Sequence, residues 1–225
     1  MIRVHVICEG ATEEDFVRKV LFEQFVGRGI HLLPSCIGRV GHKGGRVNLD
    51  RIEFDVRNRL RDRQCYCTTL FDFYHLPLKF PGMAAAEAIT DIRGKHRAVM
   101  DALSSWAEGK WGPDTAARFL PYVQMHEFEA LLFSEPEAFA LAIGQPHLAD
   151  SFQQIRSKFA NPEEINDDPN TAPSKRIESL YKGYAKPSAP ILAATEIGLD
   201  TIRRECRLFD VWLLRLEALV DGTQP

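Results

Sequence analysis

Apolar positions in the first part of the chain form short continuous runs, separated by longer stretches with helical spacing. A strand that is buried on both faces is apolar at nearly every position, whereas a helix on a sheet is apolar every three or four residues. The continuous runs predict strands at residues 2–8, 30–37, 65–73 and 117–125. The spaced pattern predicts helices at residues 12–26, 49–63, 83–107 and 126–133. This alternation indicates an α/β fold with a parallel-type sheet and helices on its faces.

The chain from residue 134 onward has a helical pattern with long polar loops. The segment 161–176 is polar and broken by proline, so we expect a loop there. Residues 202–220 predict an amphipathic helix whose apolar side belongs to the core or, as the alternative, to an interface. The apolar side chains of this helix are Phe209, Trp212, Leu213 and Leu216. We therefore expect an α/β core over residues 1–134 and a helical extension packed on it over residues 135–225.

The composition is that of a globular protein and changes this picture little. Hydrophobic residues make up 45% of the 225 positions and charged residues 26%, which is enough to build a core. The formal net charge of −3 excludes strong attraction of the whole molecule to nucleic acid, but it permits a local basic surface. No apolar run approaches about 20 residues and no signal-peptide pattern is present, so we expect a cytoplasmic protein without membrane spans. Five cysteines without a double CxxC pattern indicate reduced thiols.

Three of the predicted strands end on or beside a carboxylate. Glu9 follows the first strand, Asp72 lies at the end of the third, and Glu127 follows the fourth. Sites in open α/β sheets form beyond the carboxyl ends of the strands, so we expect these side chains at one edge. Clustered carboxylates repel one another unless a cation lies among them, and oxygen ligands suit Mg²⁺ or Mn²⁺. The alternative for each residue alone is a helix cap or a solvated loop position.

The first predicted helix begins with several acids directly after this strand end. Thr12 and Asp15 have the spacing of an N-cap signature, and Glu14 and Asp15 are favourable first-turn acids. Gly10 has no Cβ, so it permits a tight turn and a close approach of the backbone to a phosphate. Glu13 fits either a metal site or the same helix start, and the residues alone leave this open.

These residues carry a resemblance to a known fold. The stretch VICEGATEEDFV is similar to the first motif of TOPRIM-fold proteins. The form E-G-x-T-E (Glu9, Gly10, Thr12, Glu13) resembles the variant in overcoming-lysogenization-defect (OLD) nucleases. Over nearly its full length, the chain also resembles a bacterial TOPRIM-like family of unknown function. The motifs of this second resemblance are FDFYHLP, PYVQMHEFEALLFS, NPEEIND, APSKRI and C-x-x-F-x-x-W-x-x-x-L-E.

The resemblance implies a TOPRIM-like sheet and metal-dependent phosphodiester chemistry. In TOPRIM nucleases, the glutamate after the first strand and a later aspartate pair hold one or two divalent ions at the scissile phosphate. The resemblance assigns Glu9, Glu13 and Asp72 as metal ligands. The sequence departs from the family pattern because D-x-D has become Asp72-Phe73-Tyr74, so one carboxylate is missing.

The missing carboxylate is expected from Glu127 or Glu129, two residues apart after the fourth strand. An extended chain points both to one face, whereas the start of a helix turns Glu129 away, where it would be a solvated residue. His126 beside them is either a ligand or proton shuttle, or a hydrogen-bonded structural histidine. Tyr74 and His75 are expected to line the same edge.

Basic residues are the candidates for contact with a substrate. Lys175, in the APSKRI motif, either stabilises negative charge at the phosphate or is a solvated lysine at a helix start, and Arg176 leaves the same alternatives. The segment 38–63 holds eight Lys or Arg against four Asp or Glu, so it forms a local basic region. The candidates for nucleic-acid contact are His42, Lys43, Arg46 and Arg176.

Two classes of function follow. The first is a Mg²⁺- or Mn²⁺-dependent TOPRIM-type nuclease for DNA or RNA, whose catalytic residues are Glu9, Asp72, Glu127 and Lys175. The second is a regulatory module that binds a metal–nucleotide complex or a partner without catalysis, because Tyr74 replaces a carboxylate. The resemblance implies a setting in phage defence or a mobile element, with a partner ATPase. The chain itself has no G-x-x-x-x-G-K-[ST] pattern, so ATP-driven steps are expected from another protein.

Overall fold

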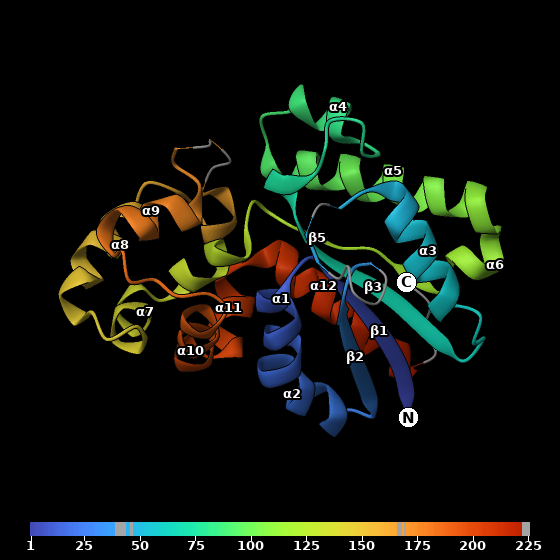
Figure 1. Cartoon of the computed structure of the whole chain (residues 1–225), viewed down its shortest axis with the longest axis horizontal. Coiled ribbons are helices and arrows are strands. Elements are labelled where there is room, and N and C mark those ends of the chain that lie inside the picture. Colours follow the sequence, from blue (N-terminus) through green and yellow to red (C-terminus); the bar gives the residue numbers. More distant parts are fainter. Residues whose placement is uncertain (39–43, 46, 166–167, 169, 222–225) are drawn as a thin grey trace. The chain divides into compact units, whose positions relative to one another are not determined.

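The computed structural model describes residues 1–38, 44–45, 47–165, 168 and 170–221, and Figure 1 traces the chain from its N-terminus. The chain divides into two compact units. The first unit consists of Met1–Val123 with Trp212–Pro225, and the second of Gln124–Val211. A division into an α/β core over residues 1–134 and an extension over residues 135–225 stays a prediction.

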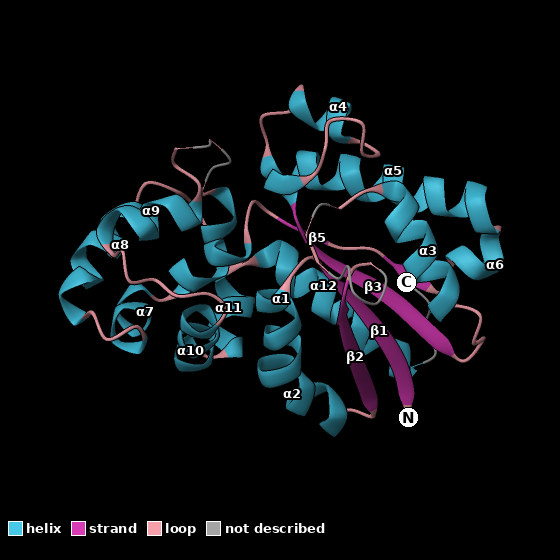
Figure 2. Cartoon of the chain, viewed as in Figure 1, coloured by secondary structure: helices cyan, strands magenta, loops and turns pink. Residues whose placement is uncertain are grey.

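The first unit is built on a parallel sheet, drawn in magenta in Figure 2. The strands are β1 (Ile2–Cys8), β2 (Ile30–Cys36), β3 (Cys65–Asp72), β4 (Phe119–Leu120) and β5 (Val123–Gln124). The first four lie in the order β2-β1-β3-β4, all paired in parallel, and β5 pairs with β3. Because Cys8 of β1 lies opposite Leu70 of β3, the carboxyl ends of these two strands meet at one edge. The predicted α/β fold with a parallel sheet is confirmed.

Helices flank this sheet (Figure 2). Those of the first unit are α1 (Ala11–Phe16), a π-helical turn (Val17–Leu21), α2 (Phe22–Gly27), α3 (Leu49–Arg59), α4 (Met83–Glu87), α5 (Ile92–Trp111) and α6 (Pro113–Ala116), with a 3-10 turn at Phe73–His75. Helix α1 contacts β1 and β2, α3 contacts β1 and β3, and α5 contacts β4. The single helix expected over residues 83–107 is wrong. Asp91 begins a new helix there by accepting a hydrogen bond from Gly94 N at 2.7 Å, which separates α4 from α5.

The last strands of the sheet are much shorter than the sequence pattern predicts. A continuous strand over residues 117–125 is wrong, because Pro121 has no N–H to donate and divides the segment into β4 and β5. The Thr69 side chain replaces the missing ladder bonds. Its Oγ1 donates to Tyr122 O at 2.8 Å and accepts a hydrogen bond from Tyr122 N at 2.9 Å. The chain is therefore held beside β3 without a regular strand.

His96 of α5 makes the stability of the first unit depend on pH. Its ring lies 5.7 Å from the ring of Tyr122, and burial, together with the charge of Arg215, lowers the pKa of His96 to about 4. The unfolded chain takes up this proton near pH 6.5, so stability is lost as pH falls from 6.5 towards 4. We expect a loss of about 2–3 kcal/mol from this residue across that window, measured by urea unfolding. The loss should be missing in His96→Gln, and an unchanged pH profile in that variant would contradict the assignment.

The second unit is helical and has an aromatic core. Its elements are the 3-10 helix Phe128–Ser134, α7 (Pro136–Ala142), α8 (Ala149–Arg156), α9 (Pro173–Leu180), α10 (Ser188–Ile197) and α11 (Leu199–Glu205), with short 3-10 turns at Pro146–Leu148 and Pro162–Glu164. The rings of Phe139 and Phe152 stack with centroids 4.5 Å apart, and both side chains are fully buried. A loop was predicted over residues 161–176, and this prediction is wrong at its C-terminal end, because α9 begins at Pro173.

The C-terminal helical segment is divided by a buried carboxylate. A single helix over residues 202–220 is wrong, because the chain turns at Cys206, between α11 and α12 (Arg207–Glu217). Glu163 is 1% exposed and accepts hydrogen bonds from Leu208 N at 2.8 Å and Phe209 N at 2.9 Å. It satisfies the first N–H groups of α12, which have no partner within the helix itself. The predicted core side chains of this helix are all buried: Phe209, Trp212, Leu213 and Leu216.

Membrane spans and disulfides were also expected to be absent. No helix in the described part of the chain is long and apolar enough to cross a bilayer. All five cysteines are described, and each is buried and free of a disulfide, as expected of reduced thiols.

Candidate functional site

Glu9, Asp72 and His75 come together where β1 and β3 end, and we name this group the carboxylate edge. Asp72 N donates to Glu9 Oε2 at 3.2 Å. His75 Nδ1 lies 3.1 Å from Glu9 Oε1 and 4.0 Å from Asp72 Oδ2. The side chains of Glu9 and Asp72 are 15% and 9% exposed, so both carboxylates are largely removed from water. The backbone holds this geometry, because Glu9 N also donates to Leu70 O of β3 at 3.1 Å.

The side chains of the carboxylate edge fit a hard divalent cation. Mg²⁺ and Mn²⁺ prefer carboxylate oxygens, and Mg²⁺ usually keeps several waters, so one or two carboxylates are enough. Glu9 and Asp72 supply that number from neighbouring strands. Among the residues that the structure describes, no group of three or more His, Cys, Asp or Glu side chains forms a metal site. Glu9 and Asp72 therefore fit an open metal site, where water or phosphate oxygens would supply the remaining ligands.

Glu13 caps the helix that follows. Gly10 N donates to Glu13 Oε2 at 2.8 Å, and Gly10 is the N-cap residue of α1, so the cap expected at Thr12 is wrong. The φ of Gly10 is −146°, so its backbone is extended and does not use the left-handed region that glycine adopts readily. A Cβ at this position would lie 3.3 Å from Glu13 Oε2, so the glycine allows this carboxylate to approach the backbone. The metal-ligand role of Glu13 stays a prediction.

Glu127 lies in the second unit, where it binds the first turn of α9. Ser174 N donates to Glu127 Oε2 at 2.9 Å, and Ser174 Oγ donates to Glu127 Oε1 at 3.2 Å. The glutamate is buried, and both of its carboxylate oxygens have partners from one residue of α9. These contacts support the helix-cap alternative for Glu127, and its roles as metal ligand and catalytic residue stay predictions.

Glu127→Ala is expected to lower the free energy of unfolding by about 2 kcal/mol, because it leaves Ser174 N–H buried without its charged acceptor. Urea unfolding in EDTA measures this loss, since a cap acts without metal. The matched control is Glu137→Ala, an exposed glutamate of α7, with a change within about 0.5 kcal/mol. The contradicting outcome is a variant that is as stable as wild type in EDTA but less stable than wild type in Mn²⁺. Glu127 would then be a metal ligand and not a helix cap.

Glu129 is buried and paired with a lysine. Its side chain is 1% exposed, and Lys186 Nζ lies 2.5 Å from Glu129 Oε1. The alternative of a solvated helix residue is wrong, because the 3-10 helix Phe128–Ser134 is buried along its whole length. Burial raises the pKa of Glu129, while the nearby ammonium opposes this rise. Burial also raises the pKa of Tyr184, and the charge of Glu129 adds to that rise. Lys186 and Tyr184 were not predicted from the sequence, because nothing in their local pattern points to a carboxylate far back along the chain.

Lys175 and Arg176 have partners within the second unit. Lys175 is exposed and lies 2.7 Å from Glu178, whose hydrogen bond raises the pKa of Lys175. Arg176 Nε donates to Thr171 O at 2.6 Å, and its guanidinium lies 5.5 Å from the centre of the Phe159 ring. Burial lowers the pKa of Arg176. These contacts agree with a solvated lysine at position 175, whereas Arg176 is part-buried and bound within the fold. The substrate roles of both residues stay predictions.

The remaining predicted site residues are divided between the two units. The Tyr74 ring packs edge-on against His75 with centroids 5.2 Å apart, and the role of Tyr74 in lining the site stays a prediction. His126 is buried in the second unit. Three of the candidates for nucleic-acid contact fall outside the described residues: His42, Lys43 and Arg46.

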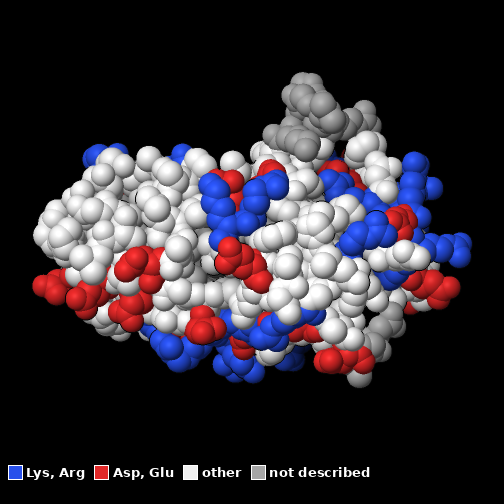
Figure 3. Space-filling view, turned by 90° about the horizontal axis from the view of Figure 1, so that it is seen from below, with Lys and Arg blue, Asp and Glu red and all other residues white. Residues whose placement is uncertain are grey.

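The basic segment 38–63 is partly engaged in the fold. Arg51 Nη2 donates to Gly44 O at 2.8 Å, and Arg59 Nη1 lies 2.7 Å from Asp55 Oδ1. On the face shown in Figure 3, basic and acidic side chains of the described residues lie side by side rather than in one basic surface. A role of this segment in nucleic-acid binding stays a prediction.

Comparisons with known proteins identify a family and no activity. A family model described as "Domain of unknown function (DUF4276)" matches residues 8–217. No curated protein and no solved structure matches the chain. The family match includes Glu9 and Asp72, but it links the chain neither to TOPRIM proteins nor to OLD nucleases.

Proposed function

The chain belongs to the DUF4276 family, a family of unknown function, and we propose that it is a TOPRIM-type nuclease that cleaves DNA or RNA with Mg²⁺ or Mn²⁺. One observation carries this proposal: Glu9 and Asp72 lie at the ends of neighbouring parallel strands, with His75 beside both. The resemblance of the E-G-x-T-E motif to OLD nucleases supports the same chemistry. The setting in phage defence and the separate partner ATPase belong to the proposal through that resemblance.

The residues of the carboxylate edge have distinct roles in this proposal. Glu9 and Asp72 would hold the divalent ion, which when bound supplies a Lewis acid for phosphate oxygens and a water of lowered pKa. The hydrogen bond from Asp72 N orients one oxygen of Glu9 before a substrate arrives. His75 is 49% exposed, so it can exchange a proton with solvent while its Nδ1 faces Glu9 Oε1.

A second candidate function is a regulatory module that binds a metal–nucleotide complex or a partner without cleaving a substrate. The replacement of D-x-D by Asp72-Phe73-Tyr74 favours it. Tyr74 packs against His75 but brings no carboxylate. Without the second aspartate of the D-x-D pattern, the carboxylate edge keeps enough ligands for one metal ion but not for a second.

A cleavage assay distinguishes the two functions. Purified protein is incubated with plasmid, single-stranded DNA and tRNA, in Mn²⁺ or in EDTA, and the products are separated by electrophoresis. We expect at least one substrate to be cleaved in Mn²⁺ and none in EDTA. A rise in thermal stability with Mn²⁺ but no cleavage would favour the regulatory module. No cleavage together with unchanged thermal stability would overturn the metal site itself.

A further inference from the structure

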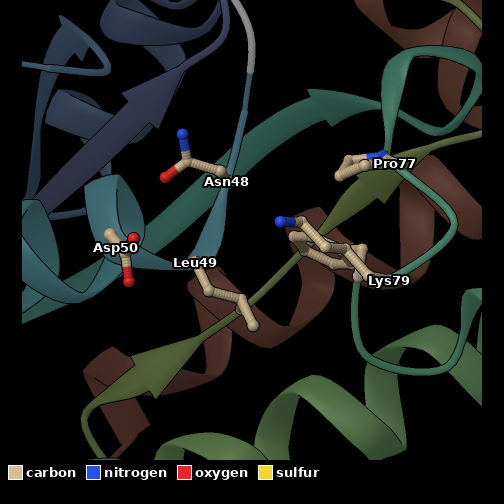
Figure 4. Close-up of a pocket in the computed structure, with 6 residues that line it drawn as sticks. Asn48, Leu49, Asp50, Pro77 and Lys79 are labelled. Atoms are coloured by element: carbon tan, nitrogen blue, oxygen red, sulfur yellow. The ribbon is translucent and has the colours of Figure 1, made fainter.

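A cavity of about 370 Å³ opens between the start of α3 and the loop that follows β3. Its lining residues are Asn48, Leu49, Asp50, Pro77, Lys79 and Phe80. Figure 4 shows Asn48, Leu49 and Asp50 on one side and Pro77 and Lys79 on the other. The volume falls at the small end of ligand sites, which span roughly 300–1,000 Å³. The cavity is therefore large enough for one small ligand or one unit of a polymer.

The polar groups of this cavity include two hydrogen-bond donors that have no acceptor among the described residues. The ammonium of Lys79 is exposed, points into the space between the two sides (Figure 4), and has no ion-pair partner among the described residues. Asn48 Oδ1 accepts a hydrogen bond from Arg51 N at 3.0 Å as the cap of α3. This bond leaves the Nδ2 donor of Asn48 without a partner in the described part of the chain. A ligand rich in acceptors, with a negative charge near Lys79, suits these groups.

The other lining groups restrict the ligand further. Leu49 and Pro77 offer apolar surface, and Phe80, which also lines the cavity, is buried. Asp50, in the first turn of α3, repels anions on that side and accepts hydrogen bonds from hydroxyl or amino groups. Anionic, apolar and hydroxyl or amino groups occur together in one nucleotide, which combines a phosphate, a flat base and a sugar.

The cavity also lies next to the carboxylate edge along the chain. Pro77 is two residues beyond His75, which contacts Glu9. The opposite side begins near Gly44, where a Cβ would lie 3.4 Å from Glu9 O. Arg51 Nη2 donates a hydrogen bond to Gly44 O at 2.8 Å, which links the first turn of α3 to Gly44. Each side of the cavity thus follows, within a few residues of sequence, a residue that lies near Glu9: His75 on one side and Gly44 on the other.

We propose that this cavity binds one nucleotide of a polynucleotide, with a phosphate against Lys79 and the base or sugar against Asn48 and Leu49. The proposal rests on the proposed function, since it supplies the substrate subsite beside the carboxylate edge. A free mononucleotide has the same chemistry, and the experiment distinguishes the two sources.

The test measures binding in EDTA, where cleavage does not occur. Fluorescence anisotropy follows the binding of labelled single-stranded oligonucleotides of two different sequences over a range of salt concentrations. The variants are Lys79→Gln, which removes the charge, and Asn48→Ser, which keeps a capping oxygen and removes the amide donor. The control is Lys182→Gln, an exposed lysine of the second unit. Unlabelled mononucleotide and inorganic phosphate serve as competitors.

Lys79→Gln should weaken binding of both sequences about ten-fold and reduce the salt slope by about one, because one phosphate contact is lost. Asn48→Ser should weaken binding by a smaller factor, and Lys182→Gln should leave it unchanged. Equal affinities for wild type, Lys79→Gln and Asn48→Ser, or no binding by wild type, would overturn the subsite. Competition by mononucleotide at the concentration where the oligonucleotide binds would overturn the polynucleotide assignment. The nuclease proposal can fail separately, in the cleavage assay, while Lys79-dependent binding remains.

Discussion

Glu9→Gln is expected to lower the rate of Mn²⁺-dependent cleavage by about a thousand-fold. Glutamine has the same size and keeps an oxygen that can accept the hydrogen bond from Asp72 N. It removes the negative charge that a hard divalent ion requires, and half of the carboxylate pair is lost with it. The measurement is the initial rate on the substrate that the wild-type protein cleaves fastest. Urea unfolding of the same preparation shows whether the fold is retained.

The matched control for this prediction is Glu23→Gln. Glu23 is exposed on α2, and the same change of charge there should leave the cleavage rate unaltered. If Glu9→Gln kept a rate within about ten-fold of wild type, Glu9 would not hold the ion, and the carboxylate edge would lose its assigned chemistry. Excess Mn²⁺ provides a further check, because a weakened ion site is partly refilled at high metal concentration.

Trp212→Ala is expected to lower the free energy of unfolding by about 3–5 kcal/mol. Trp212 is 2% exposed, and its ring stacks on Tyr122 with centroids 4.6 Å apart and an angle of 8° between the planes. Its Nε1 donates to Thr68 Oγ1 of β3 at 2.8 Å. Alanine would leave a cavity, remove the stacked ring and deprive a buried hydroxyl of one partner.

Two further variants separate the contributions of Trp212. Trp212→Phe keeps an aromatic ring against Tyr122 and loses the hydrogen bond, so we expect an intermediate loss of about 1–2 kcal/mol. Leu214→Ala changes a side chain of the same helix that is 43% exposed, and its effect should stay within about 0.5 kcal/mol. Chemical denaturation measures all three variants. Similar losses in Trp212→Ala and Leu214→Ala would contradict the packing described for α12.

Glu127 and Glu163 differ from Glu9 in the groups that contact their carboxylates. Glu127 and Glu163 accept hydrogen bonds from the first turns of helices, so their loss should lower stability with or without metal. Glu9 accepts one backbone hydrogen bond and faces an imidazole, which leaves it available to a cation. Its loss should therefore affect cleavage more than stability.

The sequence pattern alone was sufficient to predict the parallel sheet and the meeting of Glu9 with Asp72. A strand buried on both faces must be apolar at nearly every position, and this requirement is local. The carboxyl ends of neighbouring parallel strands share one edge, so two acids at such ends come together. The pattern failed where side chains from elsewhere decide the backbone, as when Glu163 divides the C-terminal helical segment and Thr69 replaces strand pairing.

Only the tertiary structure decided what the other candidate residues do. Glu127 and Glu129 are two residues apart, yet one binds the start of α9 and the other binds Lys186. The cavity beside Lys79 also arises only when the start of α3 and the loop that follows β3 come together in the fold. The role of a buried carboxylate depends on which donor comes within about 3 Å of it. Folding brings that donor from a distant part of the chain, so the residues next to the carboxylate in sequence cannot reveal it.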